Sequence, residues 1–149
     1  MAQPAATLVG HCLCGAVAFE LTLPLGPTTH CHCRSCRLSR GTAFVTWTSV
    51  PPERFRVSRG AEEITWHRTS PPVRWGFCRN CGSHMLYVAD LPGQPDGPTV
   101  GDVYVSVGSL DGAADLRPTA HVSFEEHAPW IEGAERLPRY RGKTEERMG

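Results

Sequence analysis

The sequence lacks the features that mark several common classes of protein. It has no excess of charge of either sign, because 15 lysine and arginine residues balance 15 aspartate and glutamate residues, and this balance argues against a nucleic-acid or acidic-membrane partner. No apolar run reaches the roughly 18 residues that a membrane-spanning helix needs. The first residues lack the basic segment and apolar stretch of a signal peptide. We therefore expect a cytoplasmic protein without a nucleic-acid or membrane partner.

Cysteine is missing from most of the chain, because all seven cysteines fall into three short groups. Neighbours so close in sequence rarely reach the backbone separation that a disulfide requires. Thiolates at this spacing can instead converge on one metal ion, because a tight turn directs both sulfurs to the same side. Clustered thiols without a secretion signal also indicate a reducing compartment. The groups, which we interpret as metal ligands, are Cys12 and Cys14; Cys31, Cys33 and Cys36; and Cys78 and Cys81.

The spacing allows two ways of dividing the seven thiols. In one, Cys33 and Cys36 join Cys78 and Cys81 in a zinc ribbon with a long insert, and the other three thiols are left over. In the other, the first and third groups form a four-thiolate site and the middle group forms a separate three-thiolate site. The second division keeps every group whole and leaves one ion with an open coordination position, as in catalytic zinc sites. All-thiolate ligation without iron–sulfur spacing favours zinc over iron.

Long regular elements are also missing, as 15 glycines and 13 prolines imply. Every second residue from Val17 to Leu23 is apolar, which predicts a half-buried strand at residues 16–23. The same alternation predicts a strand at 102–108. Further strands are predicted at residues 42–50, 55–57, 64–68, 73–77 and 85–89 and around Val122 and Phe124, with a helical turn at 37–41 and a loop at 90–101.

These short strands between turns predict a mainly β fold of antiparallel sheets. We expect residues 1–149 to form a single domain with its core at about residues 8–138 and a charged tail, residues 139–149, that frays. We also expect the four tryptophans, Trp47, Trp66, Trp75 and Trp130, to lie in the core or in pocket walls.

Several motifs together resemble one known family. Residues 10–17, GHCLCGAV, are similar to its G-x-C-x-C-G-A-V motif, and residues 31–37, CHCRSCR, are similar to C-H-C-x-x-C-R. Residues 74–83, RWGFCRNCGS, resemble R-x-x-F-C-x-x-C-G-S, and residues 108–130 resemble its C-terminal half. Three cysteine groups in this order are a specific pattern. Over residues 8–138 the sequence resembles the glutathione-dependent formaldehyde-activating enzyme family, also called the domain of centromere protein V.

The resemblance implies an Mss4-like fold of β-sheets stapled by zinc, and it implies the second division of the thiols. The implied activity is that of a carbon–sulfur lyase that reversibly forms S-(hydroxymethyl)glutathione, so the implied partners are a small thiol such as glutathione and an aldehyde. His84-Met85 and Gly112-Ala113 depart from the family pattern and bear on substrate choice. Two zinc ions per chain are implied, a structural ion at Cys12, Cys14, Cys78 and Cys81 and a catalytic ion at Cys31, Cys33 and Cys36.

Other functions fit the same residues. The chain could be a zinc-stabilised binding module, a carrier of glutathione or its adduct, or a sensor that releases zinc on oxidation. His32 alternates with Cys31 and Cys33, so we expect its ring to point away from their metal. We expect His121 to be a hydrogen-bonded structural residue and Arg37 and Arg74 to be solvated.

Overall fold

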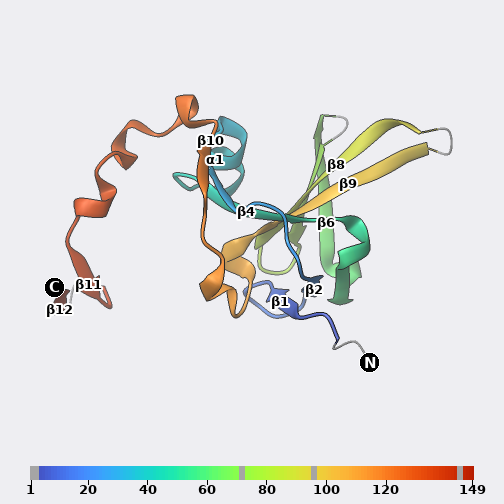
Figure 1. Ribbon diagram of the computed structural model, residues 1–149, viewed down its shortest axis with the longest axis horizontal. Helices are drawn as coiled ribbons and strands as arrows, with labels where there is room; N and C mark the ends of the chain where they lie inside the picture. Colours follow the sequence, from blue (N-terminus) through green and yellow to red (C-terminus); the bar gives the residue numbers. More distant parts are fainter. Residues whose placement is uncertain (1–3, 71–72, 95–96, 144–145) are drawn as a thin grey trace.

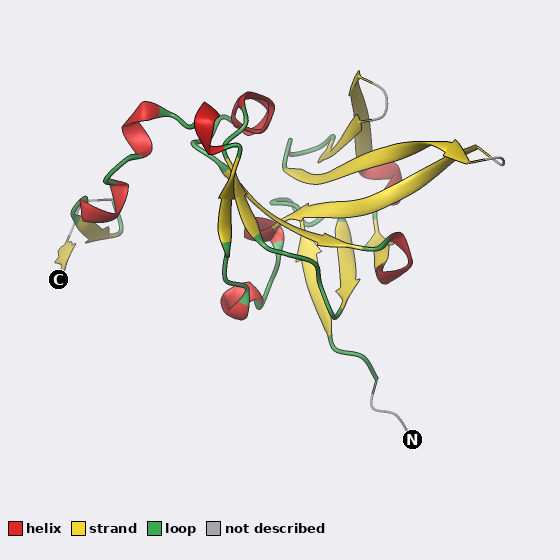
Figure 2. Cartoon of the chain, turned by 45° about the horizontal axis from the view of Figure 1, so that its top comes forward, coloured by secondary structure: helices red, strands yellow, loops and turns green. Residues whose placement is uncertain are grey.

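The structure is a computed structural model that describes residues 4–70, 73–94, 97–143 and 146–149. Its strands form three sheets, and nearly all strand pairs are antiparallel, which confirms the predicted mainly β class (Figures 1 and 2). The small sheet has the order β1-β2-β5, with β1 (Thr7–His11), β2 (Ala18–Thr22) and β5 (Phe55–Arg59). The third sheet pairs β11 (Arg139–Arg141) with β12 (Glu146–Met148).

The large sheet has the order β10-β3-β4-β9-β8-β7-β6. Its only parallel pair among the described residues joins β10 to β3. In chain order its strands are β3 (Thr29–Cys31), β4 (Val45–Val50), β6 (Ile64–Ser70), β7 (Val73–Cys78), β8 (His84–Gln94), β9 (Gly97–Ser106) and β10 (Ala120–Val122).

Helical structure is short throughout the described residues. The α-helix α1 (Arg34–Arg40) begins after Cys33 and ends at Gly41, whose φ of 62° is the left-handed conformation that glycine adopts easily. It is longer than the predicted turn at 37–41. The described residues include no helix of the length and hydropathy that crossing a bilayer requires. Single 3-10 turns are η1 (Pro52–Arg54), η2 (Ala61–Glu63), η3 (Val107–Ser109), η4 (Ala113–Asp115), η5 (Phe124–Glu126), η6 (Pro129–Ile131) and η7 (Ala134–Arg136).

The main hydrophobic core combines the small sheet with the large one. Phe19 and Leu21 of β2 are fully buried, as the alternation predicts, and belong to one cluster with Leu86 and Val105 of the large sheet. Leu23 lies beyond the end of β2 and is 36% exposed. The predicted buried face of this strand therefore does not extend to Leu23. Burial of this apolar surface is the main force that holds the two sheets together.

A second, smaller core cluster lies where α1 meets the large sheet. It joins Cys36 of α1 to Val45 and Trp47 of β4 and to Trp75 of β7, all of them buried. The expectation that tryptophans line the core is therefore right for Trp47 and Trp75. It is wrong for the other two, because Trp66 is 37% exposed and Trp130 is 70% exposed.

Two predicted irregular segments are ordered strands instead. The predicted loop at 90–101 is wrong, because β8 and β9 continue to pair through Asp90↔Val100 and Leu91↔Thr99, and Figure 1 shows them as a long projecting hairpin. Polar and glycine-rich composition does not prevent backbone groups from pairing with each other. In the predicted tail, β11 and β12 pair with each other. Figures 1 and 2 both show that the chain after β10 runs away from the two larger sheets to reach this pair.

Candidate metal centres

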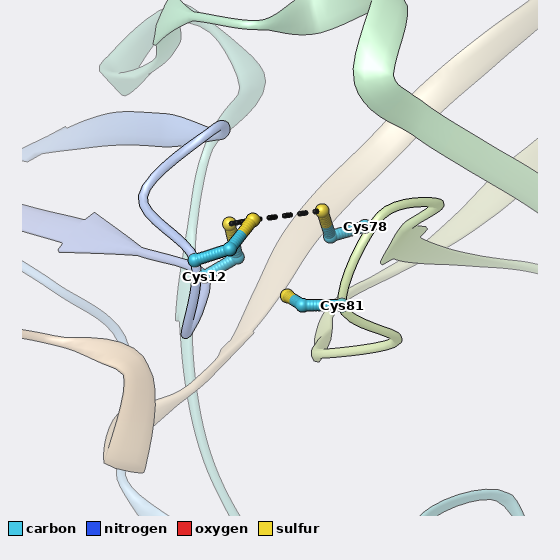
Figure 3. A group of neighbouring side chains, drawn as sticks. Cys12, Cys78 and Cys81 are labelled. Atoms are coloured by element: carbon cyan, nitrogen blue, oxygen red, sulfur yellow. Dashed lines mark hydrogen bonds between the residues drawn. The ribbon is translucent and has the colours of Figure 1, made fainter.

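Four of the predicted ligands meet where the turn after β1 faces the turn after β7 (Figure 3). Gly82 closes the second turn with a φ of 76°, and its N–H donates to the carbonyl of Cys78 over 2.8 Å. The four sulfurs all lie within 4.8 Å of one another. We call these residues, Cys12, Cys14, Cys78 and Cys81, the four-cysteine cluster.

The spacing of these sulfurs fits a tetrahedral metal ion. A zinc–sulfur distance of about 2.3 Å places the corners of a tetrahedron about 3.8 Å apart. The sulfurs of Cys12 and Cys14 are 3.6 Å apart, and those of Cys14 and Cys78 are 3.8 Å apart. A hydrogen bond from Ser83 lowers the pKa of the Cys81 thiol to about 5, which favours the thiolate that a metal requires. The donor set therefore fits zinc.

A carboxylate fixes the turn that carries the third cysteine group. Glu63, at the end of η2, accepts hydrogen bonds from Arg79 at 2.7 and 3.0 Å and from Asn80 at 2.8 Å. Arg79 and Asn80 are the two residues between Cys78 and Cys81. The hydrogen bond from Arg79, followed by that from Asn80, lowers the pKa of the Glu63 carboxyl. Glu63 thus stabilises the turn between Cys78 and Cys81 without being a member of the four-cysteine cluster.

The other three cysteines gather around the start of α1. Cys31 ends β3, Cys33 is the N-cap of α1, and Cys36 lies within the helix. Their sulfurs lie within 4.8 Å of one another. The sulfur of Cys33 accepts the backbone N–H of Cys36 over 3.3 Å. The indole Nε1 of Trp47 donates to the sulfur of Cys36 over 3.4 Å. We call Cys31, Cys33 and Cys36 the three-cysteine cluster.

The surroundings of the three-cysteine cluster make a bound cation necessary if Cys36 is to ionise. Burial raises the pKa of the Cys36 thiol, although the hydrogen bond from Trp47 acts in the opposite direction. At neutral pH this thiol therefore keeps its proton unless a positive charge displaces it. Three soft sulfur donors suit zinc, and they leave the fourth position of a tetrahedral ion to another ligand.

Histidines and phenylalanines flank the three-cysteine cluster on the side of β10. His32 is fully buried, and its Nε2 lies 2.8 Å from Nδ1 of His121. Its ring packs against Phe44 and Phe124, with centroids 5.1 and 5.0 Å away. The ring of His32 therefore meets these side chains and is not grouped with the three sulfurs, as the alternation predicts. His121 is hydrogen-bonded, as we expected.

The two arginines that we expected to be solvated contact other side chains or backbone. Arg37 donates from Nε to the carbonyl oxygen of His32 over 3.2 Å. The guanidinium of Arg74 lies 4.5 Å from the centroid of the Trp66 ring. Arg37 thereby ties α1 to the segment that carries the first two cysteines of the three-cysteine cluster.

Two pockets lie near the clusters. One, of about 650 Å³, borders Cys12 of the four-cysteine cluster, and its wall also includes Arg40, Phe44, His84 and Asp111. The other, of about 520 Å³, borders α1 at Ser35 and Leu38 and is also lined by Trp75, Phe77 and His84. Ser35 lies between Cys33 and Cys36, so the second pocket is next to the three-cysteine cluster. His84, a departure from the family pattern, lines both pockets.

The structure brings all seven predicted ligands into two groups, divided as the resemblance implied. Sequence reasoning did not identify Glu63 or Arg40 as part of either site. Arg40 had a usable signal, because it follows Cys36 by four residues and such residues share a helix face. Glu63 had none, because its partners lie 16 and 17 residues away and are reached through the fold.

The fold and the two thiol clusters place the chain in a class of mainly β proteins with two candidate metal centres. The family model described as "Glutathione-dependent formaldehyde-activating enzyme" matches residues 7–126. The chain therefore belongs to this family. The match contains both clusters, β10 and η5.

Two other comparisons agree with a family-level relationship. An uncharacterized lyase of Schizosaccharomyces pombe is 26% identical over 78 residues, which are 52% of this chain and 55% of that protein. The chain thus covers about half the length of this curated relative. A crystal structure of a Rhodobacter sphaeroides protein is 29% identical and superimposes with a TM-score of 0.56, over 76% of this chain and 99% of that one.

Proposed function

We propose that the protein is a zinc-dependent carbon–sulfur lyase that reversibly forms a thiol–aldehyde adduct such as S-(hydroxymethyl)glutathione. The proposal includes two zinc ions per chain, a structural ion at the four-cysteine cluster and a catalytic ion at the three-cysteine cluster. Its substrates are a small thiol and an aldehyde, and its compartment is the cytoplasm, where clustered free thiols remain reduced. Family membership and the lyase name of the yeast relative support this assignment.

One observation carries the proposal: three sulfurs gather apart from the other four. A tetrahedral ion with three protein ligands keeps one position for a reactant, whereas a four-thiolate ion is closed. Zinc bound at such a position lowers the pKa of a thiol or polarises a carbonyl oxygen. In the synthetic direction a bond forms between the thiol sulfur and the aldehyde carbon. The proton that the thiol loses ends on the former carbonyl oxygen as a hydroxyl group.

The residues around the three-cysteine cluster hold its ligands in place. The N-cap position of Cys33 and the hydrogen bond from the Cys36 N–H fix the first turn of α1. Trp47 fixes the sulfur of Cys36 from the core side. Such preorganisation is what a site needs if the ion is to keep an open position without collapsing into a closed one.

The test is exchange between free and thiol-bound formaldehyde, followed by NMR with ¹³C-labelled formaldehyde and glutathione. We expect the zinc-loaded protein to accelerate exchange above the buffer rate and Cys33→Ser to abolish the acceleration. Arg34→Gln is the matched control, because Arg34 is exposed beside Cys33 and provides no thiol.

The wild-type protein must be compared with buffer because thiols add to formaldehyde unaided. Fully zinc-loaded protein that exchanges no faster than buffer would refute the lyase assignment. Saturable glutathione binding without acceleration would instead identify a carrier.

A further inference from the structure

Arg40 is a partly buried cation without a matching carboxylate among the described residues. Its Nε and Nη2 atoms are sealed from solvent and have no hydrogen-bond partner there. Its Nη1 donates to the hydroxyl of Ser39 over 2.9 Å, which provides no charge. Withdrawing charged N–H groups from water without a partner is unfavourable, so an anion near these two atoms would stabilise them.

The candidate anion is the three-cysteine cluster. Arg40 follows Cys36 by four residues, so both side chains lie on the same face of α1. The guanidinium carbon of Arg40 lies 4.4 Å from the ring centroid of Trp47 and 5.0 Å from that of Trp75. The same Trp47 donates its N–H to the sulfur of Cys36. One buried indole therefore contacts both the cation and the cluster.

The charges of the two groups complement each other. A divalent ion with three thiolates has a net charge of minus one, and the apolar ring pair around Arg40 provides little screening. Burial lowers the pKa of Arg40 to about 10, while the charge of Cys36 raises it, so the guanidinium remains charged at neutral pH. Such a metal centre and Arg40 together would be neutral.

We propose that Arg40 is the counter-cation of the metal centre at the three-cysteine cluster and that it allows an anionic ligand, the substrate thiolate, to occupy the open position. Without Arg40 a fourth thiolate would bring the site to a net charge of minus two, whereas with Arg40 the charge is minus one. With a metal bound at this cluster, Arg40 would therefore favour the substrate sulfur as a thiolate at the open position over a neutral aldehyde oxygen. This inference rests on the proposed metal at this cluster, but it does not need catalysis.

The first test measures zinc affinity at each cluster by competition with a chelator. Arg40→Met keeps an unbranched stem without the charge, Arg40→Gln is a second neutral replacement, and Arg40→Lys keeps the charge. We expect the neutral variants to bind zinc about tenfold more weakly at the three-cysteine cluster and normally at the four-cysteine cluster. Arg40→Lys should remain within about threefold of wild type, and Arg34→Gln removes an exposed charge on the same helix as the control.

Two results of this experiment would overturn the proposal. One is unchanged zinc affinity of the three-cysteine cluster in both neutral variants. The other is loss of zinc from both clusters in those variants, because it would assign Arg40 to folding alone.

The second test uses the cobalt-substituted protein and 2-mercaptoethanol, a thiol without a carboxylate that Arg40 could bind directly. We expect sulfur-to-cobalt charge-transfer absorption to increase as the thiol binds, with about tenfold weaker binding in Arg40→Met. Equal thiol affinity in wild type and Arg40→Met would contradict the inference. Arg40-dependent thiol binding in a protein that does not accelerate formaldehyde exchange would retain the inference and refute the lyase assignment.

Discussion

Trp47 donates its indole N–H to the sulfur of Cys36 over 3.4 Å, and both side chains are buried. This hydrogen bond connects β4 of the large sheet directly to α1 and the three-cysteine cluster. The geometry of a candidate reactive site is therefore tied to a core strand, and a change at this strand should be measurable at the metal.

Trp47→Phe removes this hydrogen bond but keeps an aromatic ring in the core. We expect zinc affinity at the three-cysteine cluster to fall about fivefold, because a hydrogen bond to a charged acceptor contributes about 1 kcal/mol or more. Chelator competition measures the change. The four-cysteine cluster is the internal control, and equal weakening of both clusters would show that the effect comes from general loosening of the fold.

The two clusters should differ in their effect on stability. Cys78→Ser removes a ligand from the four-cysteine cluster, where Cys78 is fully buried in the main core. A structural zinc site contributes about 10 kcal/mol of folding free energy, which is comparable to the whole stability of a domain. We expect Cys78→Ser to lose cooperative unfolding in a thermal melt monitored by circular dichroism.

Cys33→Ser is the matched comparison at the three-cysteine cluster, where Cys33 is only half-buried. We expect this variant to keep a cooperative melt and to bind one zinc per chain in place of two. A loss of cooperative unfolding in Cys33→Ser, with normal melting of Cys78→Ser, would reverse the structural and catalytic assignments of the clusters.

The effect of Glu63 on stability should depend on pH. Hydrogen bonds from Arg79 and Asn80 lower the pKa of Glu63 below its ordinary value of 4.5 in the folded protein. Because the folded pKa is the lower one, the stabilisation is present at neutral pH and is lost as the pH falls through the folded pKa. Glu63→Gln should therefore lower the melting temperature at pH 7, and the difference from wild type should shrink below about pH 4.5.

Glu20→Gln is the control for this prediction. Glu20 also accepts from an arginine, Arg56, but on the small sheet away from the cysteines. We expect it to leave zinc release from the four-cysteine cluster unchanged, whereas Glu63→Gln should accelerate release. Equal zinc release rates in wild type and Glu63→Gln would show that the carboxylate does not hold the turn.

Local patterns predicted the grouping of the thiols well, because the members of each group are neighbours in sequence. The approach of Cys14 to Cys78 spans 64 residues, and spacing alone left it open. The resemblance to the family implies this pairing. Glu63 carries no comparable signal, since a glutamate is an ordinary residue of exposed segments, and Arg40 carries only its spacing of four residues from Cys36. Their roles depend on which rings and turns the fold places beside them.

The strands, too, were predictable only where the pattern lies within the strand's own residues. Alternation identified β2 correctly because one of its faces is buried in the core. The strands β1 and β3 were not predicted, since β1 is mostly exposed and β3 has only three residues. Pairing partners distant in sequence, β2 for β1 and β4 and β10 for β3, determine their conformation.

The tail strands β11 and β12 form a two-stranded sheet of their own. Within the described residues, β11 and β12 pair with each other and with no other strand, and their residues are exposed. An isolated two-stranded hairpin adds little stability. A chain that ends at Pro138 should therefore keep its melting temperature within about 2 °C, as well as two zinc ions and its exchange activity.

A deletion that ends at Thr119 is the contrasting variant, because it also removes β10 and with it His121, the hydrogen-bond partner of buried His32. We expect this chain to melt at least about 5 °C lower than wild type, because β3 then loses a strand partner beside the three-cysteine cluster. If the two deletions had equal effects, β10 would not support the cluster. If the chain ending at Pro138 lost zinc, the tail would belong to the core domain.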